Sequence, residues 1–102
     1  MDMTKTFFAD EATIAQRELA KSSHDFDTLM LLGSSTDSIT RTGVAINRHT
    51  PVVILELLAV DEEWSVRRGV AKNRATPRAL LLLLSDDDNS WVKSMALETL
   101  LA

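Results

Sequence analysis

Apolar residues along the chain fall into short segments with helical spacing, separated by polar turns. Residues 51–60 and 77–85 are apolar on nearly every side, so we expect helices that are buried on several sides. Residues 38–46 and 64–72 mix apolar and basic residues, so we expect helices with one face toward solvent. The predicted helices are 8–21, 38–46, 51–60, 64–72, 77–85 and 91–101, which indicates an all-α fold.

A 26-residue period relates the middle helices to one another. Residues 41–58 and 67–84 are identical at 11 of 18 aligned positions, where chance would give about one or two. Weaker copies lie upstream, where Leu29 precedes Leu55 by 26 residues, and downstream in the last helix. Such a period is typical of helical repeats, in which each unit packs only on its neighbours.

The copies predict a single helical-repeat domain over residues 1–102, with about three to four repeats. Two clear repeats cover residues 37–60 and 61–86. Residues 1–36 are expected to hold N-terminal capping helices with a degenerate repeat, and residues 87–102 a truncated C-terminal repeat.

Each clear repeat contains a Thr-Pro pair, at Thr50-Pro51 and Thr76-Pro77. A threonine hydroxyl can accept a hydrogen bond from a free N–H of the first helical turn, and proline suits the first helical position. We therefore expect the threonines to cap the second helix of each repeat.

Two further residue types recur at the first helix of each repeat. Gly43 and Gly69 lie inside it, where glycine costs about 1 kcal/mol relative to alanine. Because this cost is repeated, we expect a close backbone approach by the adjacent helix. Asn47 and Asn73 follow the helix, and asparagine suits a left-handed C-cap.

The second repeat resembles the leucine-rich repeat variant (LRV), a bacterial relative of the HEAT and armadillo solenoids. The family pattern is roughly acidic-x-x-W-x-V-R-x-x-V-A-x-N-x-x-T-P, followed by spaced leucines. Its positions are occupied by Asp61, Trp64, Val66, Arg67, Val70, Ala71, Asn73, Thr76, Pro77, Leu81 and Leu84. The resemblance covers residues 37–97, and Thr40 replaces the valine before the arginine in the first repeat. It implies an all-α right-handed superhelix and no catalytic chemistry.

Composition excludes several kinds of site. The chain has no cysteine, which excludes disulfides, thiolate metal sites and the iron–sulfur centre that some members of the family carry. We therefore expect no cofactor. No signal peptide and no apolar segment long enough to span a bilayer is visible, so we expect a cytoplasmic protein without membrane contact. The net charge of −4 lacks the basic excess of a typical nucleic-acid binder, although residues 37–93 hold eight acids and eight bases.

Basic residues recur at the repeat period, as Arg41, Arg67 and Lys93, and as Arg48 and Arg74. In the structural interpretation, which we favour for Arg41 and Arg67, the side chains bond to acids and carbonyls of adjacent turns. In the functional interpretation, a basic face contacts phosphates or an acidic partner. The candidate binding face comprises Arg67, Arg68, Lys72, Arg74 and Arg78. Solvated surface is the default interpretation for the last four.

The acidic turns and the histidines do not match a metal site. A calcium loop that began at Asp86 would need glycine and glutamate where the sequence has Trp91 and Leu97. We expect the acidic turns to favour the helix starts that follow them. His24 and His49 are too few for a zinc site, so we expect them at the surface.

No nucleophile, base or phosphate loop with a suitable spacing is visible, so we expect no enzyme. The sequence predicts a scaffold or adaptor whose extended surface binds another protein. The alternative is nucleic-acid binding through the basic face. Because the last helix ends with the apolar residues Leu100 and Leu101, a homodimer through this helix is a further expectation.

Overall fold

A computed structural model describes residues 10–102. This part of the chain contains seven α-helices and no strand, so the all-α prediction is confirmed there. The helices are α2 (Glu11–Ser22), α3 (Phe26–Gly33), α4 (Ser38–Ile46), α5 (Val52–Leu58), α6 (Trp64–Lys72), α7 (Arg78–Leu84) and α8 (Ser90–Leu101). The first predicted helix corresponds to α2, and its residues 8 and 9 lie outside the described part. None of the helices in residues 10–102 is long and apolar enough to cross a bilayer.

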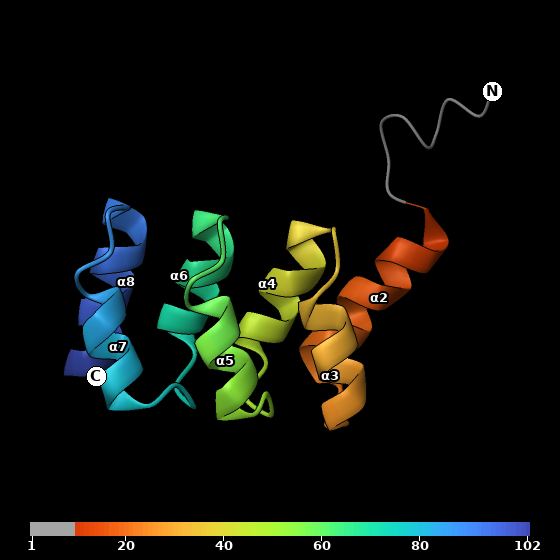
Figure 1. Ribbon diagram of the computed structural model, residues 1–102, viewed down its shortest axis with the longest axis horizontal. Helices are drawn as coiled ribbons and strands as arrows, with labels where there is room; N and C mark the ends of the chain where they lie inside the picture. The colour runs from red at the N-terminus through yellow and green to blue at the C-terminus, as the bar shows by residue number, and fades with distance from the viewer. Residues whose placement is uncertain (1–9) are drawn as a thin grey trace.

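The helices form two rows. In the first row α2, α4, α6 and α8 pack on one another in that order, and in the second row α3, α5 and α7 each contact the helices before and after them in sequence. Figure 1 shows the helix pairs following one another along the long axis, from α2 on the right to α8 on the left. The molecule measures 48 × 29 × 20 Å, so it is elongated in this direction. Within the second row the backbones of α3 and α5 approach each other more closely than those of α5 and α7.

The core lies between the two rows. The second row contributes leucines three residues apart, and both members of each pair point toward the first row because three residues nearly complete a helical turn. The buried leucine pairs are Leu29 with Leu32, Leu55 with Leu58, and Leu81 with Leu84. Val44, Val70 and Val92 of the first row are fully buried. Complete burial of such a side chain contributes about 1.5–3 kcal/mol, which makes this layer the main source of stability.

The second-row helices α5 and α7 are buried on one side only, so the prediction that they are enclosed on several sides is wrong. Val53 and Leu57 are 49% and 58% exposed, and Leu82 and Leu83 are 49% and 58% exposed. The reason is architectural, because the first row covers one side of these helices and no described element covers the other.

The threonines of the Thr-Pro pairs do not cap a helix, so that prediction is also wrong. Pro51 and Pro77 occupy the N-cap positions of α5 and α7, without a side-chain cap bond. The Thr50 hydroxyl instead donates to the carbonyl oxygen of Val44 at 2.7 Å, and Thr76 makes the equivalent bond in the next repeat. The last carbonyls of a helix lack partners within it, so these hydroxyls complete the ends of α4 and α6.

Asn47 and Asn73 follow α4 and α6 with φ angles of −72° and −75°, so the predicted left-handed cap is wrong. Their side chains are buried and point back toward the preceding repeat. The Asn47 amide nitrogen donates to the carbonyl oxygens of Ala20 and Ser23 at 2.9 and 2.8 Å. The Asn73 amide nitrogen donates to those of Ala45 and Asn47 at 2.8 and 3.0 Å. Each asparagine therefore connects two successive first-row helices.

The expected close approach at the repeated glycines is confirmed. A Cβ atom built on Gly69 would lie 2.9 Å from the Cβ of Ala45, and one built on Gly43 would lie 2.9 Å from the Cβ of Ala20. Carbon atoms do not pack at this distance, so the observed spacing of the first-row helices requires glycine at both positions.

Candidate functional site

Three arginine–aspartate ion pairs connect successive helix pairs, and each joins residues 20 apart in sequence. Every pair is bidentate, with one bond from Nε and one from Nη2 of the arginine. The pairs are Arg17–Asp37 at 2.8 Å, Arg41–Asp61 at 2.8 Å and Arg67–Asp87 at 2.9 Å. Arg41 and Arg67 therefore bind acids of adjacent turns, which agrees with the structural interpretation of the basic series.

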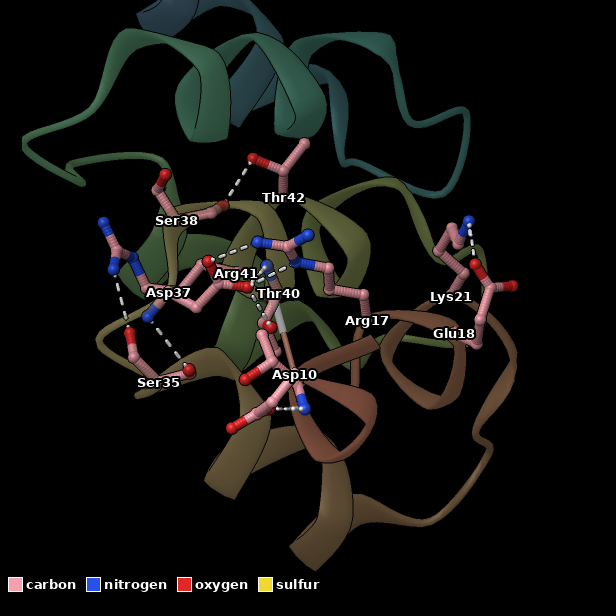
Figure 2. A network of polar contacts seen from close by, with 11 residues as sticks. Asp10, Arg17, Glu18, Lys21, Ser35, Asp37, Ser38, Thr40, Arg41 and Thr42 are labelled. Carbon is pink, nitrogen blue, oxygen red and sulfur yellow. Dashed lines mark hydrogen bonds and ion pairs between the residues drawn. The ribbon is translucent and has the colours of Figure 1, made fainter. Parts of the chain in front are cut away.

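The Arg17–Asp37 pair was not found from the sequence, because both residues lie off the repeat period. The position 26 residues before Arg41 is Ala15, and the position 26 residues before Asp61 is Ser35. Ser35 takes the same place in its turn as Asp61, since its carbonyl oxygen accepts a bond from Arg41 at 2.8 Å. Asp37 supplies the missing carboxylate two residues later, and Arg17 points toward it in Figure 2.

Asp37 has two structural tasks. It caps the start of α4 by accepting hydrogen bonds from the N–H and the hydroxyl of Thr40. It also binds Arg17. The bonds from Arg17, with those from Thr40, hold the pKa of the Asp37 carboxyl well below its usual range, although burial opposes the shift. For Asp87, burial alone would raise the pKa, but bonds from Arg67 and the Asn89 N–H outweigh it and lower the pKa.

The five residues of the predicted basic face do not lie together. Arg67 is bound to Asp87, and its Nη1 donates to the carbonyl oxygen of Asp61 at 2.7 Å. The other four form no ion pair within residues 10–102. Two of them lie one turn apart on α6, one lies in the turn after it, and one opens α7 in the second row; they are Arg68, Lys72, Arg74 and Arg78. The predicted face is therefore divided between the two rows.

Lys72 and Arg74 border a shallow hollow of about 230 Å³ between α6 and α8. Glu98 of α8 lines the same hollow, so an acid partly offsets the two cations there. Lys93, the third member of the Arg41 series, is exposed and forms no ion pair within the described residues.

The acidic turns act in the ion pairs and in turn formation. Asp61 accepts a hydrogen bond from the Glu63 N–H, and Asp87 accepts one from the Asn89 N–H, both at 2.9 Å. Asn89, which the sequence analysis did not single out, caps α8. Within residues 10–102 no group of three acidic or histidine side chains is arranged to hold a metal ion.

His24 and His49 lie in neighbouring turns at the surface, as predicted. Their rings lie against each other, with centroids 3.6 Å apart and an interplanar angle of 31°. Burial, followed by electrostatic interaction with His24 and Arg48, lowers the pKa of His49. Two stacked rings present no convergent set of metal ligands.

The second row carries a series of exposed leucines, two of them in the helices that were expected to be buried on several sides. Leu31 of α3, Leu57 of α5 and Leu83 of α7 stand 26 residues apart and are 74%, 58% and 58% exposed. We call these three residues the leucine series. Each lies two residues after a buried leucine, which places it on the other side of its helix. The spacing of the leucines in the sequence could therefore have separated the exposed from the buried members.

Two hollows lie between α5 and α7 beside this series. In the lower one, Val52 and Glu56 of α5 face Ala79 and Leu80 of α7 across about 220 Å³. The upper one, of about 270 Å³, is lined by the turn after α5, the end of α7 and the turn after it, including Val60, Leu83, Asp86 and Asp88. Arg67 and Asp87, which are bonded to each other, also line it. We call the two hollows together the α5–α7 groove.

The last helix, α8, also exposes apolar side chains. It packs on α6 and α7 through Val92 and Ala96, which are fully buried. Trp91, Leu97 and Leu101 are 65%, 46% and 86% exposed. This surface lies on a different helix from the leucine series and is a second candidate for an apolar binding surface.

Comparison with known proteins identifies no relative of this chain: no protein-family model, no curated protein and no solved structure matches it. The resemblance to the leucine-rich repeat variant therefore stays a prediction from the residue pattern. On the surface of the molecule, the leucine series and the α5–α7 groove are the features that the packing of the core does not explain.

Proposed function

We propose that this chain is a non-enzymatic helical-repeat scaffold that binds another protein through its second row. The observation that carries the proposal is the leucine series, in which Leu31, Leu57 and Leu83 are each more than half exposed. Single exposed leucines are common on protein surfaces, but these three recur at equivalent positions of successive units, and exposed apolar surface that gathers on one side is typical of interaction sites. Repeat proteins use such extended surfaces to bind partners.

The proposal includes a right-handed superhelix with a 26-residue period, as the resemblance implies. Recurring contacts support the period. Arg41 and Arg67 each bind a carboxylate 20 residues later, and Asn47 and Asn73 each donate to the turn of the preceding repeat. We also propose a cytoplasmic location, which fits a chain without cysteine.

A comparison of captured proteins tests the binding function. The native chain and the variant Leu31→Ser/Leu57→Ser/Leu83→Ser would be immobilised and exposed to the same native lysate. We expect a protein that the native chain retains, the variant loses, and the purified native chain binds directly. Leu101→Ser is the matched control, because it also removes an exposed leucine but lies on α8. Identical sets of proteins on native chain and triple variant would contradict the proposal.

Nucleic-acid binding is the second candidate, and the four cations without ion pairs are the observation that favours it. Arg68 and Lys72 lie one turn apart on α6, so both can reach one phosphate backbone. Arg67 no longer belongs to this set, because its guanidinium is bonded to Asp87 and Asp61. A salt-dependent mobility shift of a DNA or RNA duplex that is lost in Arg68→Ala/Lys72→Ala would support it. The absence of a mobility shift at low salt would exclude nucleic-acid binding.

A further inference from the structure

We propose that the α5–α7 groove binds a cationic amphipathic helix of a partner protein. This inference rests on the proposed binding function and adds the location and the chemistry of the partner. It follows from three properties of the groove: an apolar lining on both sides, a length that suits a short helix, and carboxylates without partners along it.

The lining is apolar on both helices. Val52 of α5 borders the lower hollow and is 44% exposed, and Val60, in the turn after α5, borders the upper hollow and is 72% exposed. Ala79 and Leu83 of α7 lie one turn apart on the side that borders the same hollows. The apolar side chains of a partner helix could therefore contact both walls at once.

The length of the groove suits a short helix. From Val52 to Leu58 α5 rises about 9 Å, at 1.5 Å per residue, and the turn with Val60 extends the lining beyond its end. This corresponds to about two turns of a partner helix that lies along the groove. Because the hollows of the groove are open toward solvent and lined by exposed side chains of both helices, a partner helix can lie over them from outside. A helix whose apolar stripe lies in an apolar groove is a common mode of peptide recognition.

The charges along the groove are mainly negative. Glu56 lines the lower hollow, and Asp86 and Asp88 line the upper hollow. Arg67 also lines the upper hollow, but its charge is compensated by its ion pair with Asp87. The side chains of Glu56, Asp86 and Asp88 are exposed, and none of them forms an ion pair within residues 10–102. The one cation in the helical parts of α5 and α7 is Arg78, at the start of α7. Lysine or arginine residues beside the apolar stripe of a partner would complement the three carboxylates.

The same charges disfavour other occupants. A second copy that used this face would bring its own Glu56, Asp86 and Asp88 toward the same carboxylates, so like charges would meet. An anionic membrane and a nucleic acid would be repelled for the same reason. A partner helix with lysines beside an apolar stripe meets neither obstacle.

A titration with designed peptides tests the inference. The probe is a fluorescent peptide of about 18 residues, long enough to form a helix, with leucines on one face and lysines beside them. A second peptide keeps the leucines and carries glutamate at every lysine position. We expect the lysine peptide to bind the native chain, and the glutamate peptide to bind at least about tenfold more weakly.

Two variants locate the site, and each has a matched control. Leu83→Ser should weaken binding of the lysine peptide by at least about tenfold, while Leu101→Ser on α8 should leave it unchanged. Asp86→Asn/Asp88→Asn should weaken it by about fivefold at low salt and have little effect at high salt, while Glu98→Gln should have no effect. Far-UV circular dichroism and the midpoint of thermal unfolding show that each variant is folded.

The outcomes separate this inference from the proposed function. Equal binding of both peptides would overturn the charge preference, and no peptide binding would overturn the helical occupant. In either case the proposed function stands if the triple leucine variant still loses a captured protein. No peptide binding together with no loss of captured protein would overturn both. Stronger binding to vesicles of anionic lipid than to the lysine peptide would also overturn the inference.

Discussion

Asn73 donates its side-chain N–H to the backbone carbonyl oxygen of Asn47, which lies 26 residues earlier, at 3.0 Å. Asn47 makes the same kind of bond to Ser23 at 2.8 Å. Both asparagine side chains are buried, and within residues 10–102 no buried side-chain nitrogen or oxygen lacks a partner. These amides satisfy backbone groups at the ends of the first-row helices that have no helical partner.

Replacement of Asn73 by alanine should lower the free energy of unfolding by about 2–3 kcal/mol. The change removes the donor to the carbonyl oxygen of Ala45 and the acceptor of the Ala75 N–H. It also removes one of the two donors to the carbonyl oxygen of Asn47, which keeps the bond from the Thr50 N–H. Urea denaturation followed by circular dichroism measures the loss. The control is Arg74→Ala, an exposed neighbour that should change stability by less than about 0.5 kcal/mol. Equal losses in the two variants would show that the buried amide contributes nothing.

Gly69→Ala should destabilise the protein by about 1–3 kcal/mol through overpacking, although alanine is the better helix former by about 1 kcal/mol. The new Cβ would lie 2.9 Å from the Cβ of Ala45. Ala45→Gly should therefore recover part of the loss in the double variant, which a thermodynamic cycle measures. Gly33→Ala is the control, because its nearest neighbour would be the Cγ2 of Ile54 at 3.5 Å, an ordinary contact. A Gly69→Ala variant as stable as Gly33→Ala would contradict the close approach.

The elements that local chemistry determines could be predicted from the sequence. The helical spacing of apolar residues predicted α4, α6 and α8 to within one or two residues. The repeated cost of Gly43 and Gly69 predicted the close approach, because only a packing contact compensates for glycine inside a helix. The sequence predicted that Arg41 and Arg67 bind acids of adjacent turns, although it did not name the partners. An arginine at the same position of each repeat lies next to the equivalent turn each time.

The remaining features depend on partners that a single repeat does not show. Asn47 suits a left-handed cap as well as a buried donor, and only the carbonyls of Ala20 and Ser23 decide between them. The Arg17–Asp37 pair was missed because both residues are shifted from the repeat positions. The exposure of Leu57 was not expected, because an apolar helix does not indicate how many of its sides the rest of the protein covers.

The Arg17–Asp37 pair should make stability depend on pH in the acid range. The pKa of Asp37 is lower in the folded than in the unfolded chain, where an aspartate titrates near 3.9. The ionised carboxylate therefore contributes its full stability above about pH 4, and this contribution is lost as the pH falls further. Asp37→Asn should reduce the slope of the free energy of unfolding against pH below about pH 4, as measured by urea denaturation. Asp88→Asn, which removes an exposed carboxylate without an ion pair, serves as the control, and identical slopes for Asp37→Asn and the native chain would contradict this role.

The histidine pair should add a second pH dependence near neutrality. The pKa of His49 is lowered in the folded chain, so the unfolded chain, with a pKa near 6.5, binds its proton more readily. The contribution of neutral His49 to the free energy of unfolding is complete above about pH 6.5, and it is lost as the pH falls below this value. His49→Ala should reduce this slope without disrupting the turn, because alanine occupies the equivalent position 75 in the next repeat. Thermal unfolding between about pH 7 and pH 5 measures the change, and an unaltered slope would exclude His49 as its source.

Self-association through α8 is the last prediction, and it concerns a surface separate from the leucine series. Leu97 and Leu101 lie one turn apart on the exposed side of α8, at 46% and 86% exposure. Pairing of this side with its copy would remove apolar surface from water, which contributes about 25 cal/mol for each Å². We therefore expect the mass from light scattering to rise with concentration toward that of a dimer, and Leu97→Ser/Leu101→Ser to restore the monomer. Leu31→Ser on α3 is the control and should leave the dimer unchanged. A strict monomer at high concentration would refute the interface, whereas a dimer that Leu31→Ser dissociates would move it to the second row and compete with the proposed partner.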